Sequence, residues 1–217
     1  MTLSLFGSAD GNQIWREALG PGAVVLRGFA LADETALITA IDAVIARAAF
    51  RHMETPGGYR MSVAMSCCGA WGWVTDSTGY RYQDTDPQTG LAWPEMPEAL
   101  HALAERAAAS AGFAGFKPDA CLINRYEPGA RMSLHQDKDE RDYSAPIVSV
   151  SLGLPAIFQF GGMARSDRAL RVPLVHGDVV VWGAEARLRY HGVMPLKAGM
   201  HALLGAQRIN LTFRKAW

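Results

Sequence analysis

Short apolar runs separated by turns fill the second half of the chain. From Asp119 onward each run has four to eight residues, and glycine or proline pairs such as Pro128-Gly129 follow several of them. The runs cover residues 120–126, 147–154, 157–160, 179–182, 188–191 and 208–214. Repeated short strands with turn signals are typical of a sandwich or barrel. The pattern therefore predicts a mostly β (α+β) protein with a jelly roll and helices packed outside it.

The first half predicts a strand over residues 23–29 and two amphipathic helices. The first helix follows Asp33 as its N-cap, and the second begins near Pro97 and ends at Gly112. Their apolar faces consist of Leu37, Ile38, Ile41, Val44 and Ile45 in the first and of Leu100, Leu103 and Ala107 in the second. Residues 55–95, rich in glycine, threonine and aromatic side chains, are expected to form hairpins and loops.

Composition supports a single folded domain over residues 1–217. Hydrophobic residues make up 49% of the chain and charged residues 19%, which argues against disorder. No apolar run approaches the ~20 residues that cross a bilayer. Met1 to Trp15 lack the features of a secretion signal, so we expect a cytoplasmic protein without a membrane segment.

Charge and cysteine content narrow the kind of site to expect. The net charge is zero, yet residues 1–120 carry a net −5 and residues 121–217 a net +5, so an anionic ligand is expected in the second half. The three cysteines, Cys67, Cys68 and Cys121, have no Cys-x-x-Cys spacing. This favours free thiols over a disulfide framework or a zinc site.

Polar side chains recur at every second position in four segments. Residues two apart in a strand point to the same face, so these sets predict a polar interior. The sets are His135 with Asp137, Asn124 with Tyr126, Ser149 with Ser151, and Arg208 with Asn210, Thr212 and Arg214. Because unpaired buried charge is costly, we expect a bound metal and a bound anion as partners. Arginine pairs well with carboxylates, which indicates a small dicarboxylate.

His135 and Asp137 supply two thirds of the two-histidine-one-carboxylate set that binds non-haem Fe(II) and leaves coordination positions open. The third ligand must be another histidine. His191, beside a predicted strand, is favoured over His201 in a glycine-rich connection, because a regular element holds a ligand more firmly. The remaining histidines, His52, His101 and His176, are expected to be solvated, capping or turn residues.

The combined motifs resemble the AlkB family of Fe(II)- and 2-oxoglutarate-dependent dioxygenases, which repair alkylated nucleic acid. The resemblance extends from Gly20 to Arg214. The matching blocks are Asn124-Arg-Tyr126-x-Pro-Gly, Ser133-Leu-His-Gln-Asp-Lys-Asp139, Pro146-Ile-Val-Ser-Val-Ser-Leu-Gly153, Phe158-Gln-Phe-Gly-Gly162, His176-Gly-Asp-Val-Val-Val-Trp182 and Arg208-x-Asn210-x-x-x-Arg214, with His191 between the last two.

This resemblance implies a double-stranded β-helix over residues 119–217, with helices and a nucleotide-recognition lid within residues 20–118. The lid would lie near Thr55 to Tyr82. The implied catalytic and iron-binding residues are His135, Asp137 and His191. The implied 2-oxoglutarate ligands are Asn124, Tyr126, Arg208, Asn210 and Arg214, with Arg208 on the distal carboxylate.

The resemblance also assigns substrate-binding residues. Trp73 and His135 would enclose the damaged base. Tyr80 would contact the backbone, Asp139 would sense the exocyclic amine, Arg165 would lie at the pocket, and Met65 and Tyr59 would line it. The loop over residues 74–78 is more acidic than is usual in the family. We therefore expect the affinity for the phosphate chain, or the preferred strand type, to differ from that of the relatives.

The implied reaction is removal of methyl groups from 1-methyladenine and 3-methylcytosine in single-stranded DNA by a monomer. The reaction needs Fe(II) as cofactor, consumes 2-oxoglutarate and O2 as co-substrates, and releases formaldehyde, succinate and CO2. Double-stranded DNA and RNA stay open as further substrates. Two alternatives are an Fe(II)/2-oxoglutarate hydroxylase acting on a small molecule or protein side chain, and a non-catalytic nucleic-acid-binding module in which the His-x-Asp pair is structural.

Overall fold

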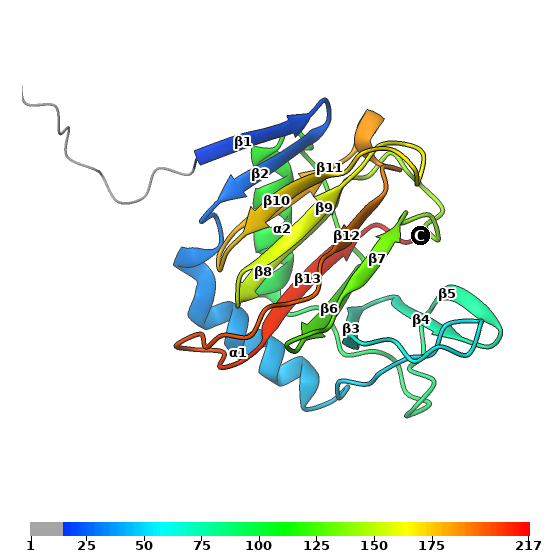
Figure 1. Ribbon diagram of the computed structural model, residues 1–217. Coiled ribbons are helices and arrows are strands. Elements are labelled where there is room, and N and C mark those ends of the chain that lie inside the picture. The colour runs from blue at the N-terminus through cyan, green and yellow to red at the C-terminus, as the bar shows by residue number, and fades with distance from the viewer. Residues whose placement is uncertain (1–14) are drawn as a thin grey trace, which may run out of the picture.

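Two antiparallel sheets face each other in the computed structural model, which describes residues 15–217 (Figure 1). The larger sheet has the order β1-β2-β11-β8-β13-β6-β3 and the smaller one the order β10-β9-β12-β7. The strands of the larger sheet are β1 (Trp15–Gly20), β2 (Ala23–Arg27), β3 (Ala64–Gly69), β6 (Ala120–Tyr126), β8 (Ile147–Gly153), β11 (Val179–Trp182) and β13 (Arg208–Arg214). Those of the smaller sheet are β7 (Met132–His135), β9 (Ala156–Phe160), β10 (Leu170–Leu174) and β12 (His191–Val193).

The two faces of strand β13 differ: one is apolar and packs under the helices, and the other is polar and faces the smaller sheet. Ile209, Leu211 and Phe213 belong to a buried apolar cluster shared with the helices. Because side chains alternate along a strand, the residues between them face the smaller sheet instead. The buried polar residues of β13 are Arg208, Asn210, Thr212 and Arg214, as the sequence predicted. The space between the sheets therefore combines apolar packing with a polar site.

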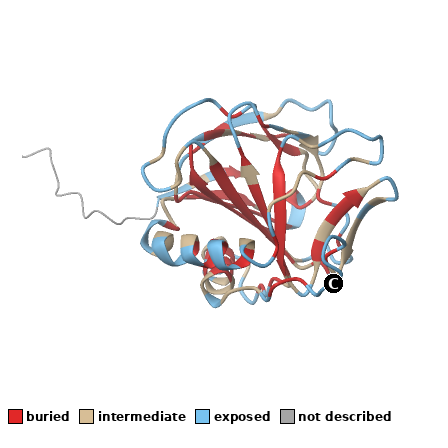
Figure 2. Cartoon of the chain, turned by 90° about the horizontal axis from the view of Figure 1, so that it is seen from below, coloured by how far each residue is buried: buried red, intermediate tan, exposed pale blue. Residues whose placement is uncertain are grey.

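The helices α1 (Glu34–Ile45) and α2 (Glu98–Ser110) cover the outer face of the larger sheet (Figure 1). Figure 2 shows the solvent-facing sides of the helices exposed and the central strands buried. Pro97 and Gly112 flank α2 closely, which confirms the second helix. Asp33 is the N-cap residue of α1, as predicted, but its carboxylate makes no capping hydrogen bond. Its carboxylate accepts a hydrogen bond from Arg106 at 2.6 Å instead.

A separate hairpin extends beyond the β3 edge of the larger sheet (Figure 1). It consists of β4 (Gly72–Asp76) and β5 (Gly79–Gln83), within the predicted lid segment. Gly72 lies flush against the Trp93 indole, where a Cβ atom would collide with the ring. The predicted lid segment also contains β3, which pairs with β6 and so belongs to the larger sheet rather than to the hairpin.

One predicted strand is misplaced and three strands were missed. Residues 188–190 do not form a strand; His191 begins β12 rather than ending a strand before it. The reason is that the turn that follows the short 3₁₀ helix η2 (Ala184–Ala186) extends to Arg189, whose N–H donates to the Ala186 carbonyl. A second short 3₁₀ helix, η1 (Leu31–Asp33), lies in the connection before α1. The sequence reading also omitted β1, β7 and β10.

The facing antiparallel sheets confirm the predicted jelly-roll class. No helix of residues 15–217 has the length and apolar character that a membrane crossing requires. The prediction that Met1 to Trp15 contain no secretion signal concerns residues that, apart from Trp15, lie outside the described range.

Candidate active site

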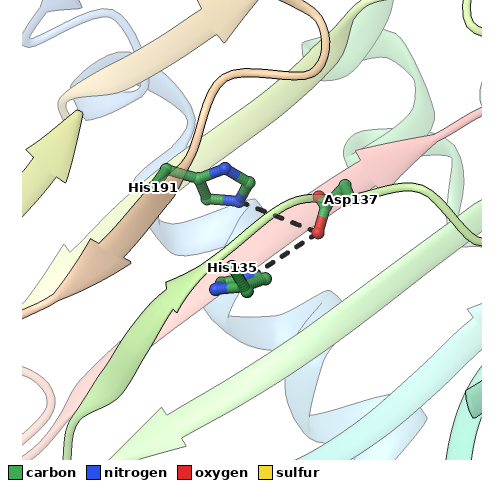
Figure 3. Close-up of side chains that lie close together, drawn as sticks. All are labelled: His135, Asp137 and His191. Atoms are coloured by element: carbon green, nitrogen blue, oxygen red, sulfur yellow. Dashed lines mark ion pairs between the residues drawn. The ribbon is translucent and has the colours of Figure 1, made fainter. Parts of the chain in front are cut away.

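Three metal-ligating side chains converge at one end of the smaller sheet (Figure 3). His135 ends β7 and His191 begins β12, and the two residues are direct partners in the strand pairing. Asp137 follows His135 by two residues. Its Oδ1 lies 3.5 Å from His135 Nε2 and 3.7 Å from His191 Nε2. The three ligand atoms lie within 4.8 Å of one another, which suits a single ion.

Local hydrogen bonds orient both imidazoles. His135 Nδ1 lies 2.9 Å from the Ser133 carbonyl, and His191 Nδ1 lies 3.1 Å from the Arg189 carbonyl. A neutral imidazole that donates from Nδ1 leaves the Nε2 lone pair free toward the shared centre. Burial and the neighbouring His135 lower the pKa of His191 to about 4, so its imidazole is neutral at physiological pH.

Asp137 is held ionised by its surroundings. Burial opposes its ionisation, but the charge of Arg214 and the interactions with the two histidines outweigh burial and hold the pKa of the carboxyl well below its usual range. Arg214 contacts Asp137 Oδ2 through Nε at 2.8 Å and Nη2 at 2.7 Å. Oδ1 is thereby left to face the histidines. Two imidazoles and one carboxylate form the ligand set of a non-haem Fe(II) site with open positions.

A buried acid and a buried arginine, which the sequence analysis missed, support this centre. Glu140 lies 3.4 Å from Arg214 and accepts a hydrogen bond from Arg187 at 3.1 Å. Arg187 also donates to the carbonyl oxygen of Asp137 at 2.8 Å. Tyr82 of the hairpin donates to Glu140 at 2.7 Å. Glu140 and Arg187 do not belong to an alternating strand pattern, which is why they were not predicted. The one available indication in the sequence was that Glu140 directly follows the motif that ends at Asp139.

All five predicted 2-oxoglutarate residues line one small cavity of about 50 Å³ between the sheets, together with His135 and His191. Arg208 Nη2 donates to Ser151 Oγ at 2.9 Å. Its Nε and Nη1 are buried and have no hydrogen-bond partner among the described residues. Burial lowers the pKa of Arg208, although Tyr126 opposes this shift. A carboxylate would fill the unused positions of this guanidinium, so the residues present fit a dicarboxylate.

The six predicted substrate residues line a second, larger cavity of about 750 Å³. They are Trp73, Tyr80, Asp139, Arg165, Met65 and Tyr59. The rings of Trp73 and Tyr80 stack with their centroids 5.7 Å apart, and Trp73 Nε1 donates to Asp139 Oδ2 at 2.7 Å. His135 and Arg214 line both cavities, so the two cavities meet at the metal centre.

The acidic hairpin loop is internally neutralised. Asp76 pairs with Arg81 at 2.7 Å and accepts hydrogen bonds from Thr78. The hydrogen bond from Arg81 lowers the pKa of Asp76. The negative charge for which a changed affinity for the phosphate chain was expected is therefore offset within the hairpin.

The other histidines have separate partners. His176 Nδ1 accepts a hydrogen bond from the Gly153 N–H, as the turn prediction required, and its ring stacks on His201. His52 Nδ1 contacts the Met61 carbonyl, and His101 lies 3.8 Å from Glu105. Of the two candidates for third ligand, the structure thus brings His191 to the cluster and leaves His201 elsewhere.

Comparisons with known proteins agree with this geometry. The sequence model of the 2OG-Fe(II) oxygenase superfamily matches residues 22–214. Alpha-ketoglutarate-dependent dioxygenase AlkB of Escherichia coli (strain K12) is 59% identical, over 99% of this chain and 98% of that protein. DNA N(6)-methyladenine demethylase ALKBH1D of Arabidopsis thaliana is 30% identical over 91% of this chain and 50% of that protein. The solved structure of OsALKBH1 matches with a TM-score of 0.81 and 30% identity, covering 92% of this chain and 99% of that one.

Proposed function

The chain belongs to the AlkB family of the 2OG-Fe(II) oxygenase superfamily, and from this premise we propose that it is an oxidative demethylase of N-alkylated bases in nucleic acid. Its cofactors are iron and, as co-substrates, 2-oxoglutarate and O2. One observation carries the proposal: two cavities meet at His135, one suited to a dicarboxylate and the other lined by stacked rings and a carboxylate.

We assign the iron to His135, Asp137 and His191. When bound, iron would let O2 supply both oxidations: one oxygen atom would convert 2-oxoglutarate to succinate and CO2, and the other would hydroxylate the N-methyl group, which then leaves as formaldehyde. Arg214 keeps Asp137 ionised and turns Oδ1 toward the histidines. Asp137 and His191 are therefore already in the deprotonated forms that bind a divalent ion.

We assign 2-oxoglutarate to the small cavity. Arg208 would bind the distal carboxylate through the two nitrogens that lack partners. Asn210 is held in place by hydrogen bonds to Ser149 and to the Val150 carbonyl, and Asn124 donates to Asn210 at 3.3 Å. The cavity walls are therefore fixed before the ligand arrives, which reduces the entropic cost of binding it.

We assign the alkylated base to the larger cavity. 1-Methyladenine and 3-methylcytosine carry positive charge, which the face of Trp73 attracts by about 0.5–2 kcal/mol more than a neutral ring. Asp139 adds a carboxylate beside Trp73. The free energy needed to flip a base out is smaller when the base cannot pair, and it is smallest in a single strand. These considerations favour methylated single-stranded DNA as the substrate.

The proposal is tested by measuring succinate release with matched single-stranded oligonucleotides. We expect one 3-methylcytosine in the strand to stimulate succinate release and to yield formaldehyde, whereas the unmodified strand should do neither. Basal succinate that no methylated strand stimulates would overturn the proposal. It would point instead to a hydroxylase of small molecules or protein side chains.

A further inference from the structure

A second aromatic cluster lies at the base of the hairpin, outside both cavities. The rings of Trp71 and Trp217 stack with centroids 4.6 Å apart and an angle of 30° between their planes. The guanidinium of Arg141 lies over the Trp217 ring. None of these three residues lines either cavity. Trp217 is also 46% exposed, so filling the core does not account for its position.

Asp119 fixes Trp217 beside the hairpin. Its carboxylate accepts hydrogen bonds from the backbone N–H of Ala216 at 2.6 Å and of Trp217 at 3.2 Å, and it pairs with Lys215 at 2.8 Å. The carbonyl oxygen of Asp119 accepts a hydrogen bond from the Trp71 N–H at 3.2 Å. One residue thus anchors both the segment that carries Trp217 and the first residue of the hairpin base.

The same segment also contacts the opposite wall of the substrate cavity. The N–H of Arg141 donates to the Ala216 carbonyl at 3.2 Å, and Arg141 lies two residues after Asp139. On the hairpin side, Trp71 lies two residues before Trp73. The hairpin and the loop that carries Asp139 are therefore joined at the front by two hydrogen bonds, from Trp73 to Asp139 and from Tyr82 to Glu140. They are joined from behind by the Trp71, Trp217 and Arg141 stack.

We propose that Trp217 is a positioning residue for the substrate site, holding the hairpin and the loop that carries Asp139 at a fixed spacing. This inference rests on the proposed function, because it assigns the spacing to the binding of an alkylated base. Stacked aromatic pairs favour one geometry, and Trp217 makes such a contact on the hairpin while Arg141 packs on its ring. Its loss would leave the two hydrogen bonds, from Trp73 to Asp139 and from Tyr82 to Glu140, to hold this spacing without the stack behind them.

The test compares Trp217→Ala, Trp71→Ala and the double variant with wild type, using methylated single-stranded oligonucleotide. We expect each single variant to raise the KM for oligonucleotide about threefold to tenfold, the effect of losing one aromatic contact. The kcat and the basal succinate release without oligonucleotide should stay unchanged. The double variant should be no worse than either single one, because both remove the same stack. Trp217→Phe should restore most of the wild-type KM.

Hydrogen exchange in heavy water supplies a readout that is independent of catalysis. Amides of residues 72–83 should exchange faster in Trp217→Ala and Trp71→Ala. They should not do so in Trp15→Ala, which removes an exposed tryptophan at the far edge of the larger sheet. Unchanged exchange in the hairpin, an unchanged KM, or a parallel fall in basal succinate release would overturn the positioning role. A wild-type enzyme that releases no formaldehyde would instead contradict the proposed function, and exchange would then decide whether the stack holds the hairpin.

Discussion

Two arginines on β13 are equally buried but have opposite surroundings. Arg214 contacts Asp137 and Glu140, and although burial lowers its pKa, the acidic neighbours raise it overall. Arg208 donates to Ser151 and lies over the Tyr126 ring, has no acidic partner, and keeps two nitrogens without hydrogen-bond partners among the described residues. The charge of Arg214 is therefore already paired within the protein, whereas the charge of Arg208 is available to pair with a bound anion.

This contrast predicts opposite effects on stability when each arginine is replaced by methionine. In the protein without 2-oxoglutarate, Arg208→Met should leave the free energy of unfolding unchanged or raise it, since an uncompensated buried charge is removed. Arg214→Met should lower it by about 3–5 kcal/mol, because Asp137 and Glu140 lose their partner. Arg208→Met should also raise the KM for 2-oxoglutarate at least about 30-fold, the effect of losing a charge contact of ~2 kcal/mol.

Urea unfolding of the two variants and succinate assays across 2-oxoglutarate concentrations provide the measurements. Equal destabilisation by both substitutions would show that Arg208 is paired within the protein. A normal KM for 2-oxoglutarate in Arg208→Met would remove this residue from the co-substrate site.

The buried thiols predict a loss of stability at alkaline pH. Burial raises the pKa of Cys67 to about 12 and also raises that of Cys121. A group with a raised pKa contributes its full stabilisation below its unfolded value, near 9, and loses it as the pH rises toward 12. The free energy of unfolding should fall over this range, and the fall should be shallower in Cys67→Ala. A thiol reagent should label none of the three cysteines in the folded protein at neutral pH.

Among the elements, the hairpin β4–β5 places the Trp73 ring on the wall of the larger cavity. Trp73 stacks on Tyr80 and donates its indole N–H to Asp139. Trp73→Ala should lower kcat/KM for methylated oligonucleotide about 5- to 150-fold, as the loss of stacking on one base of ~1–3 kcal/mol predicts. Trp73→Phe should keep most of this activity, because the phenylalanine ring can still stack on the base although the hydrogen bond to Asp139 is lost.

Basal succinate release serves as the control for both variants, because Trp73 does not line the 2-oxoglutarate cavity. An equal loss of basal and oligonucleotide-stimulated succinate in Trp73→Ala would remove Trp73 from the substrate role.

Elements with continuous apolar runs could be predicted from the sequence, and exposed or edge elements could not. The runs that became β6, β8, β9, β11 and β13 are buried on both faces or alternate clearly. β10 is an edge strand that contains Pro173 and has three exposed residues, so its pattern is weak. β1 is also exposed at a sheet edge, and β7 has four residues with no apolar run.

At the scale of the whole molecule, the site depends on pairing between distant segments. Residue types and strand alternation predicted the inward set of Arg208, Asn210 and Arg214. The sequence favoured His191 because a strand was predicted over residues 188–191, but residues 188–190 form no strand, and the place of His191 depends instead on the pairing of β12 with β7 and β9. Glu140 and Arg187 were missed for a related reason: both lie in irregular connections, and their contact appears only once the chain has folded.

Metal binding should stabilise the whole fold, because the three ligands come together only in the folded protein. At 100 times its dissociation constant, Fe(II) under anaerobic conditions should add about 2.7 kcal/mol, equivalent to a rise in Tm of roughly 5–10 °C for a chain of this size. Differential scanning fluorimetry measures the shift. His201→Ala should keep it and Asp137→Ala should lose it. A shift of equal size in Asp137→Ala would place the ion elsewhere.

The most direct test of the central claim is product analysis with a single-stranded oligonucleotide containing one 1-methyladenine, in the presence of Fe(II), ascorbate and 2-oxoglutarate. We expect formaldehyde in a one-to-one ratio with restored adenine, no product with Asp137→Ala, and wild-type yield with His201→Ala. Restored adenine in the Asp137→Ala reaction, or none from iron-loaded wild-type protein that still releases succinate, would contradict the assignment of this site to base demethylation.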